Sequence, residues 1–423
     1  MLDFYLNWLN QHQFHGIRPG LTRIVRLLKR LGNPHRKYPA LHIAGTNGKG
    51  STCALLNALL TEHGLKTGLY TSPHLFKLNE RFKINSRDIS DEELGEVLRT
   101  LYKVSEEPVT YFELTTALAF LYFAEKKVDL AIIETGLGGR LDATNVILPE
   151  IAFITSIGLD HTRYLGPTLE RIAFEKAGII KRGKPLVLGK MEEKPLAVIL
   201  ERAKILSAEV FLLNRDFKIE AKSSLWNYQG RYHYPYLESA LQGDYQGSNL
   251  ALAIKGLEIL EDKGFLKLEE KKLREALRKV AWEGRYKKIT LASKEVLFDC
   301  AHNLEGIKAL KESLLKENFS PFILVFGATN EDGEKPFFSL LEELLPLASR
   351  VIISEFKAER RVVSIQDWIQ ALGDRGSFEF FQEPLSALKE ALASGGCPRI
   401  LITGSIYFVA EALKALKELQ DAL

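Results

Sequence analysis

A glycine-rich segment at residues 45–52 constrains the fold of this chain more than any other feature. It reads Gly-Thr-Asn-Gly-Lys-Gly-Ser-Thr, and the apolar run at 41–44 predicts a strand directly before it. A helical pattern follows over 53–62. In this order the N–H groups of the turn and the positive end of the helix dipole face one point. The segment therefore predicts a phosphate-binding loop inside an α/β sheet.

Three side chains of this loop suit nucleotide chemistry. Lys49 is placed to reach β- and γ-phosphates, and Ser51 or Thr52 offers a hydroxyl to Mg²⁺. The spacing departs from the general P-loop pattern, because Gly50 stands between the lysine and the serine. The alternative is a tight turn with a solvated lysine. The strand before the loop and the helix after it favour phosphate binding.

The composition bounds the class of protein. The chain has 423 residues, 46% hydrophobic and 26% charged, with a formal net charge of +3. This length favours two domains, and no basic stripe suggests nucleic-acid binding. Three scattered cysteines indicate a reducing compartment rather than a disulfide framework. No signal peptide and no apolar stretch of about 18 residues is visible, so we expect a cytoplasmic protein without membrane contact.

Apolar runs alternate with helical patterns in the first half of the chain. Strands are predicted over 66–71, 128–134 and 151–155. Helices are predicted over 90–104, where Ser90 and Glu93 form a capping box, and over 111–124. Such alternation predicts a mostly parallel sheet whose ligands bind at the carboxyl ends of the strands.

The alternation restarts after a loop at 282–287, which we take as the domain boundary. Before it, 217–222 and 225–234 are expected to be antiparallel strands, followed by helices at 246–263 and 268–280. After it, strands are predicted at 296–299, 322–326, 351–354, 378–381 and 400–403, with a charged loop at 331–335 and a last helix from 406. We therefore expect an α/β protein. It has a P-loop-containing N-terminal domain with a mostly parallel sheet at 1–287 and a smaller Rossmann-like α/β domain at 288–423.

Polar residues follow the predicted strands. Glu134 ends a buried strand, where a carboxylate needs a cation or hydrogen bonds, and Mg²⁺ bridging phosphates would supply one. The alternative is a structural carboxylate. The next segment, 135–145, contains three glycines with Arg140 and Asp142. It suggests a flexible loop whose mobile cation closes over a substrate.

Other polar positions are ambiguous by themselves. His161 would be a hydrogen-bonded loop histidine, since Mg²⁺ prefers oxygen ligands, and Lys176 would be a solvated helical lysine. In the second half, 299–303 and 403–407 each follow a strand. Together with Arg285 they suggest that part of a ligand lies in a cleft between the domains.

Several of these segments together resemble a known family. They are GTNGKGST (45–52), YTSPHL (70–75), ETGLGGRLDATN (134–145), TSIGLDHT (155–162), IAFEKAGIIK (172–181), DCAHN (299–303) and TGSIYFVAEAL (403–413). In this order, and across nearly the whole chain, they resemble folylpolyglutamate synthase, which is often bifunctional as dihydrofolate synthase. That family belongs to the ATP-dependent amide ligases that include the Mur ligases.

The resemblance implies a reaction and its cofactors. A pterin-linked carboxylate takes the γ-phosphate of ATP, and the amine of L-glutamate attacks the resulting acyl phosphate. This chemistry needs charge neutralisation and positioning more than covalent help from the protein. By position, the phosphates of ATP would contact Asn47, Gly48, Lys49, Gly50, Ser51 and Thr52. Two Mg²⁺ ions would lie among Ser51, Ser72, Glu134 and His161.

The resemblance also implies the remaining site residues. Catalytic roles fall to Lys49, Arg140, Lys176 and His302, with Lys176 matching a lysine that is carbamylated in the family. Adenosine and phosphates would contact Asn249, Arg285 and Asp299. The pterin would lie near Phe112, Glu113, Thr115, Leu141, Asp142 and Ala143. Departures occur at Cys300, where glycine is usual, and at Leu304, where proline is usual; both bear on turn shape.

Two other functions fit parts of the pattern. A Mur-like ligase acting on another carboxylate would carry an additional N-terminal domain, and only 44 residues precede the loop. A P-loop ATPase or nucleotide switch would not require the second domain with its own polar strand ends. Within the favoured reading, dihydropteroate, tetrahydrofolate or both are candidate substrates, and we expect a monomer.

Overall fold

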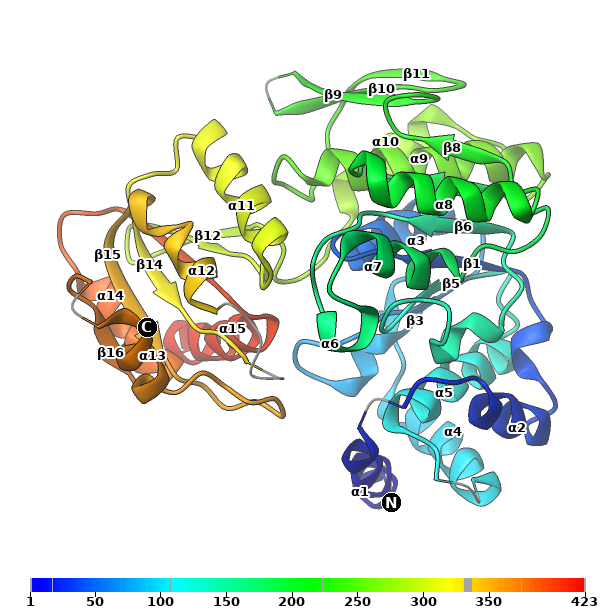
Figure 1. Ribbon diagram of the computed structural model, residues 1–423, viewed down its shortest axis with the longest axis horizontal. Coiled ribbons are helices and arrows are strands. Elements are labelled where there is room, and N and C mark those ends of the chain that lie inside the picture. The colour runs from blue at the N-terminus through cyan, green and yellow to red at the C-terminus, as the bar shows by residue number, and fades with distance from the viewer. Residues whose placement is uncertain are drawn as a thin grey trace. The chain divides into compact units, whose positions relative to one another are not determined.

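The structure, a computed structural model, describes residues 2–16, 18–105, 108–222, 224–330, 337–373 and 375–421. The chain divides into two compact units (Figure 1). The first comprises 1–240 and 246–281, and the second comprises 241–245 and 282–423. Each unit combines helices with a largely parallel sheet, which confirms the predicted α/β class.

An eight-stranded sheet forms the centre of the first unit. Its order is β4-β3-β2-β5-β1-β6-β7-β8, with β3 and β4 as an antiparallel edge and the other strands parallel. The strands are β1 (Ala40–Ala44), β2 (Thr67–Tyr70), β3 (Phe82–Ile84), β4 (Arg87–Asp88), β5 (Leu130–Glu134), β6 (Ile151–Ile154), β7 (Leu186–Leu188) and β8 (Val210–Leu212). Every residue of β1 and β5 is buried. The glycine-rich loop thus begins at the centre of the sheet.

Helices cover both faces of this sheet because alternate strand residues point to opposite sides. On one face, α3 (Lys49–Glu62) packs with α9 (Gln246–Asp262) and α10 (Glu270–Lys279), and Phe153 of β6 meets Gly256 of α9. On the other, Ala152 and Ile154 pack with α7 (Leu169–Ala177) and α8 (Glu193–Ile205). That second face also carries α5 (Tyr111–Lys126), against β2 and β5.

The remaining helices of the first unit begin where the sequence indicates. Ser90 and Glu93 form the predicted capping box of α4 (Asp91–Val104), and Thr110 forms another with Glu113 at the start of α5. The other helices are α1 (Leu2–Gln11), α2 (Thr22–Arg30) and the short α6 (Thr162–Leu165). The chain before β1 is therefore largely helical.

A separate antiparallel sheet in the first unit contains β9 (Lys218–Lys222), β10 (Leu225–Gln229) and β11 (His233–Leu237). The prediction of one continuous strand over 225–234 was wrong, because the chain turns at Gly230. A Cβ atom there would lie 2.3 Å from the hydroxyl oxygen of Tyr228, so the turn requires glycine. The two parts of the predicted strand pair with each other instead.

The second unit contains a six-stranded sheet in the order β12-β13-β17-β14-β15-β16. Its strands are β12 (Lys287–Leu291), β13 (Lys294–Phe298), β14 (Phe322–Phe326), β15 (Ala348–Ser354), β16 (Glu379–Phe381) and β17 (Arg399–Thr403). Its helices are α11 (Leu304–Lys316), α12 (Phe337–Glu342), α13 (Ile365–Leu372), α14 (Pro384–Ala393) and α15 (Ile406–Asp421). The five predicted strands are present, but β12, an antiparallel edge strand, was not predicted.

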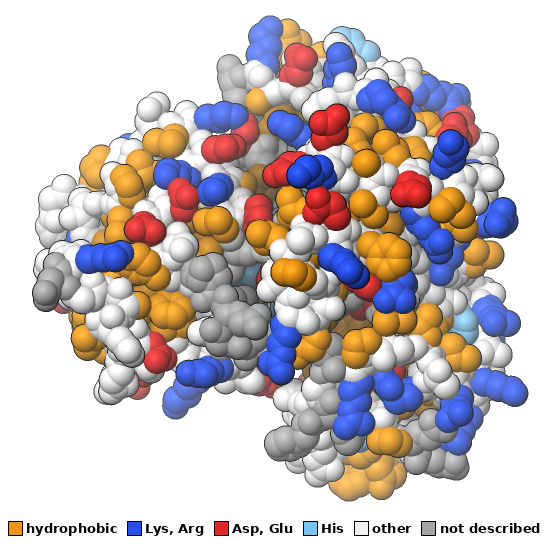
Figure 2. Space-filling model, in the orientation of Figure 1, with side chains coloured by type: hydrophobic (Ala, Val, Ile, Leu, Met, Phe, Trp, Pro, Cys, Tyr) orange, Lys and Arg blue, Asp and Glu red, His pale blue; other side chains and the backbone are white. Residues whose placement is uncertain are grey.

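The sequence also predicted that the chain has no membrane-spanning stretch and no basic stripe on its surface. None of the described helices has the length and apolar character needed to cross a membrane. On the face shown in Figure 2, Lys and Arg side chains are interspersed with Asp and Glu. The predicted charged loop at 331–335 lies outside the described residues.

Candidate active site

The glycine-rich loop is shaped by approaches that only glycine allows. Gly48 caps the N-terminus of α3 in the left-handed region, with φ of 87°. A Cβ atom at Gly48 would lie 2.3 Å from Oδ1 of Asn249. One at Gly45 would lie 1.9 Å from Oγ1 of Thr155. The loop is therefore pressed between the start of α9 and the segment that follows β6.

The segment 155–161, which follows β6, holds the first part of the loop. The N–H groups of Thr46 and Asn47 donate to the carbonyl oxygen and to Oγ of Ser156, both at 2.9 Å. Oγ1 of Thr155 donates to the carbonyl of Asn47 at 2.6 Å. The donors that face an anion are therefore those of the first turn of α3, which lack partners within the helix.

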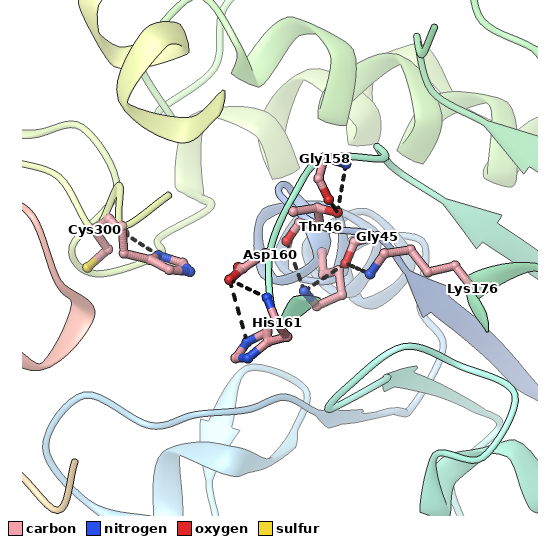
Figure 3. Close-up of polar contacts among 9 residues, drawn as sticks. Gly45, Thr46, Gly158, Asp160, His161, Lys176 and Cys300 are labelled. Carbon is pink, nitrogen blue, oxygen red and sulfur yellow. Dashed lines mark hydrogen bonds and ion pairs between the residues drawn. The ribbon is translucent and has the colours of Figure 1, made fainter. Parts of the chain in front are cut away.

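Two lysines converge on the loop, and Figure 3 labels one of them, Lys176. Nζ of Lys49 donates to the carbonyls of Gly45 and Thr46 at 3.0 and 3.1 Å. Nζ of Lys176, on α7, donates to the same Gly45 carbonyl at 2.8 Å. Lys176 is 4% exposed, so the prediction of a solvated lysine from spacing alone was wrong. The structure places its amine at the glycine-rich loop.

The electrostatic setting of Lys176 is unusual for a lysine. Burial lowers its pKa to about 7, and the charge of Lys49 adds to the effect. The nearby charges of Asp160 and Asp142 oppose it. A substantial fraction of the amine is therefore neutral near pH 7, which makes it available for reaction with an electrophile.

Glu134 lies at the carboxyl end of β5, beside the loop. Its carboxylate is buried, and its Oε2 accepts the N–H of Ser72 at 3.0 Å. Burial raises the pKa of the Cys53 thiol, the charge of Glu134 raises it further and the charge of Lys49 lowers it. Glu134 and Lys49 therefore both lie close to the first turns of α3.

Two buried oxygen groups at this end of the sheet, the carboxylate of Glu134 and the hydroxyl of Ser51, suit a hard cation. Oγ of Ser51 is buried in the first turn of α3 and accepts Nε2 of Gln246 at 3.2 Å. Hydroxyl and carboxylate oxygens are the ligands that Mg²⁺ prefers. Among the described residues no three His, Cys, Asp or Glu side chains are grouped as a metal site. Any Mg²⁺ here would therefore take much of its coordination from phosphate and water.

His161 stands on the same segment that supports the loop. It precedes α6 in the left-handed conformation, with φ of 51°, and its backbone N–H donates to Oδ1 of Asp160 at 2.9 Å. Its Nε2 lies 3.9 Å from the same oxygen, and its side chain is 31% exposed (Figure 3). The imidazole is accessible at the carboxyl end of the sheet.

The start of α9 is bonded to the start of α3. Oδ1 of Asn249 accepts Oγ1–H of Thr52 at 3.4 Å, and its Nδ2 donates to Oε1 of Gln246 at 2.9 Å. With the contact between Gln246 and Ser51, this network fixes the hydroxyls of Ser51 and Thr52. Sequence analysis named Asn249, Ser51 and Thr52 but missed Gln246. The available signal was its place close to Asn249 at the polar start of a largely apolar helix.

The segment 135–145 is more firmly held than the sequence suggested. The carboxylate of Asp142 accepts the N–H groups of Gly136 and Leu137 at 3.0 and 2.9 Å. The guanidinium of Arg140 pairs with Glu175 at 2.8 Å and lies 5.4 Å from the ring centroid of Phe174. Asp142 therefore cross-links this segment and Glu175 pairs with Arg140, whereas the expectation of a flexible loop with a mobile cation stays a prediction.

The predicted pterin residues of α5 lie at its N-terminus. Phe112 covers Gly136, where a Cβ atom would lie 2.4 Å from the ring. Glu113 caps the helix and pairs with Arg23 of α2 at 3.1 Å. The hydroxyl of Thr115 is fully buried and 2.9 Å from that of Tyr70. Phe112 is thus adjacent to the segment 135–145, whereas Glu113 and Thr115 are held by protein contacts.

The polar strand end of the second unit centres on Asp299. Its Oδ2 accepts the hydroxyl of Tyr245 at 2.6 Å and the N–H of Tyr286 at 2.9 Å. Burial raises the pKa of Asp299, and the charge of Arg285 opposes this, so the guanidinium lies close by. Nδ1 of His302 donates to the carbonyl of Cys300 at 2.9 Å, which leaves Nε2 as the second polar atom of the ring.

Comparison with known proteins agrees with this geometry. The Mur ligase middle domain matches residues 43–255. The dihydrofolate synthase/folylpolyglutamate synthase of Bacillus subtilis is 35% identical over 97% of this chain and 98% of its own length. A folylpolyglutamate synthase structure from Thermotoga maritima is 33% identical, with a TM-score of 0.84, covering 98% of this chain and 96% of that chain. FolC of E. coli, solved in complex with DHPP and ADP, is 27% identical, with a TM-score of 0.89 and 98% of each chain covered.

Proposed function

The chain belongs to the dihydrofolate synthase/folylpolyglutamate synthase family, and we propose that it joins L-glutamate to a pterin-linked carboxylate using ATP. One observation supports placing this reaction at the glycine-rich loop. Lys49 and Lys176 converge on the Gly45 carbonyl at the glycine-rich loop, beside the buried carboxylate of Glu134. Such a cluster suits a reaction in which phosphate charge must be neutralised.

The proposed reaction has two steps. A carboxylate oxygen of the pterin substrate attacks the γ-phosphorus of ATP, and ADP leaves as the bond to its bridging oxygen breaks. The amine of L-glutamate then attacks the acyl carbon, losing a proton, and inorganic phosphate leaves as the amide forms. Neither step needs a covalent bond to the protein, so positioning and charge stabilisation supply the catalysis.

The chain's own residues would act on the phosphates. The first turn of α3 presents its N–H groups, and Lys49 moves from the carbonyls of Gly45 and Thr46 to phosphate oxygens. Asn249 would contact ATP beside the loop, and in the second unit Arg285, Asp299 and His302 stay predicted nucleotide contacts. Arg140 would have to leave Glu175 to act as a cation on the substrate.

Ser51, Ser72, Glu134 and His161 would hold Mg²⁺ in this proposal. The buried hydroxyl of Ser51 and the buried carboxylate of Glu134 fit such an ion, and His161 is accessible on the supporting segment. Bound Mg²⁺ would neutralise charge on the phosphates during transfer. A second ion is proposed from the family resemblance, with a carbamylated Lys176 as part of its coordination.

We expect Glu134→Gln to raise the Mg²⁺ concentration for half-maximal ligation about tenfold and to lower the maximal rate, because it removes a ligand charge. The amide oxygen can still accept the N–H of Ser72, so thermal unfolding should stay close to that of the unmodified protein. A magnesium titration of the ligation rate measures the effect. Glu150→Gln is the control, since Glu150 pairs with Lys184 and Lys263. An unchanged titration for Glu134→Gln would make that carboxylate structural.

The proposed pterin site lies along Phe112 and the segment 141–143. Phe112 offers an aromatic face next to Gly136, whereas Asp142 and Glu113 already accept hydrogen bonds from the protein. These carboxylates would therefore shape the site as well as contact the substrate. The proposal covers dihydropteroate, tetrahydrofolate or both as glutamate acceptors.

An assay of ADP release separates the functions. Ligation predicts that release requires a pterin carboxylate and L-glutamate together, and running dihydropteroate and tetrahydrofolate separately identifies the acceptor. ADP release that is indifferent to both would indicate a nucleotide switch. Release that depends on another carboxylate would indicate a Mur-like specificity.

We also propose a cytoplasmic enzyme that acts as a monomer. All three cysteines are buried and free, which suits a reducing compartment. Equilibrium sedimentation of the purified chain tests the oligomeric state directly.

A further inference from the structure

A buried histidine in the central strand has no part in the reaction proposed above. His42 is fully buried in the middle of β1. Its register with Ile133 and Ala152 directs its side chain to the sheet face that carries α5 and α7. Burial lowers its pKa to about 3, and the charge of Lys181 adds to the effect, so the ring is neutral at physiological pH. A buried polar ring must be hydrogen-bonded to be tolerated.

The hydrogen bonds from this ring have a defined direction. Nε2 of His42 lies 2.8 Å from Oγ1 of Thr144. The Thr144 hydroxyl donates its only proton to Oδ1 of Asp142. It can therefore only accept from His42, so Nε2 carries the imidazole proton. Nδ1 is then unprotonated, and it is buried without a hydrogen-bond partner among the residues that the structure describes.

The relay of hydrogen bonds from His42 through Thr144 ends on the carboxylate of Asp142, which holds the segment 135–145 together. Oδ1 of Asp142 also accepts the N–H of Thr144 at 3.0 Å, and Oδ2 accepts those of Gly136 and Leu137. One carboxylate thus joins the two ends of the segment 136–144. Gly136 in turn lies directly under the ring of Phe112. The placement of Phe112 against the loop depends on how this carboxylate is turned.

From these contacts we propose that His42 is a positioning residue for the pterin substrate. Its Nε2–H orients the Thr144 hydroxyl, and that hydroxyl orients the carboxylate of Asp142. The carboxylate in turn holds the segment 135–145 against Phe112. The imidazole touches neither ATP nor the reacting atoms and acts only through this relay. The inference rests on the proposed function, because it assumes that the pterin lies along Phe112 and the segment 141–143.

Two substitutions at His42 separate the hydrogen bond from the volume of the ring. His42→Leu fills much of the space but donates nothing, whereas His42→Gln places an amide N–H the same number of bonds from Cα as Nε2. We expect His42→Leu to raise the KM for the pterin about tenfold, with the KM for ATP and for glutamate within about twofold of the original values. His42→Gln should recover most of the loss.

A double-mutant cycle tests the relay itself. Thr144→Val should raise the pterin KM as His42→Leu does, and the double variant should be no worse than the more affected single variant. Thr67→Val is the matched control, since Thr67 is equally buried and bonded through its hydroxyl to Asn57 at 2.7 Å, at the start of β2. It should lower thermal stability without a selective change in the pterin KM.

Amide hydrogen exchange supplies a readout that needs no substrate. Exchange at Gly136 and Leu137 should quicken in His42→Leu and Thr144→Val and stay unchanged in His42→Gln and Thr67→Val. The inference is overturned if the unmodified enzyme ligates glutamate but His42→Leu keeps its pterin KM, or if all three KM values rise together. An unmodified chain that makes no ligated product would instead overturn the proposed function, and with it the substrate named here.

Discussion

Lys49→Ala should lower the rate of ATP-dependent ligation by two orders of magnitude or more. In the proposed mechanism the amine acts on phosphate charge that develops in the transition state, and removing one such preorganised donor commonly costs a factor of about 10² to 10³. Among the described residues Nζ bonds the carbonyls of Gly45 and Thr46, which belong to the loop itself. The variant should therefore stay folded, with thermal unfolding close to that of the original chain.

The measurement is a steady-state ligation rate at saturating ATP, pterin and glutamate. Lys190→Ala, at an exposed lysine of the same unit, is the control and should be fully active. Activity above about a tenth of the original, which corresponds to about 1.4 kcal/mol, would remove Lys49 from the mechanism.

Lys176→Ala should be nearly inactive, for a reason tied to its burial. An ammonium group next to Lys49 would add positive charge to a site that already contains the Lys49 cation and is proposed to bind Mg²⁺. Its pKa, lowered to about 7, keeps part of the amine neutral, and a neutral amine reacts with CO₂. The proposed carbamate would have a negative charge and two acceptor oxygens, which suit a second Mg²⁺.

Substitutions and small anions distinguish this carbamate from a simple cation. Acetate or formate added to Lys176→Ala should restore part of the rate by filling the vacated anionic position. Lys176→Arg keeps the positive charge but cannot form the carbamate at neutral pH, so it should stay inactive. Activity of Lys176→Arg equal to that of the original chain would refute the carbamate.

The sign of the pH dependence follows from the lowered pKa. Below about pH 6 the Lys176 amine is largely protonated and unreactive towards CO₂, whereas above about pH 8 it is largely neutral. Incorporation of ¹³C-labelled bicarbonate, followed by NMR of the carbamate carbon, should therefore rise from pH 6 to pH 8. The same signal should be absent from Lys176→Arg, and a signal that persists unchanged in that variant would assign it to another amine.

The sequence predicted the sheet centres well because their strands have a local signature. The segments that became β5 and β14 are continuous apolar runs, which suit strands buried on both faces. In contrast, β12 begins with Lys287 and Lys288 and lies half-exposed at an edge, so its pattern resembles that of a loop. The turn at Gly230 was missed because the residues on either side of it look alike in polarity.

In the candidate site, too, features built from neighbouring residues could be predicted, whereas contacts between distant residues could not. The strand, glycines and helix of the phosphate loop are neighbours in sequence, so their order was readable. The burial of Lys176 on a carbonyl that lies 131 residues away in the chain was not. The four hydrogen bonds that Asp142 accepts could not be predicted from the sequence either, so the segment 135–145 was expected to be flexible. A histidine inside an apolar strand was visible in the sequence, but its partner Thr144 became evident only in the fold.

Transfer of oxygen from the pterin carboxylate to phosphate tests the central claim most directly. A pterin acceptor labelled with ¹⁸O in its free carboxylate would be incubated with ATP and L-glutamate, and the released inorganic phosphate analysed by mass spectrometry. Ligation through an acyl phosphate predicts one labelled oxygen in each phosphate, together with stoichiometric amide. Phosphate that contains only unlabelled oxygen while ATP is consumed would contradict it, because the γ-phosphate would then have been transferred to water.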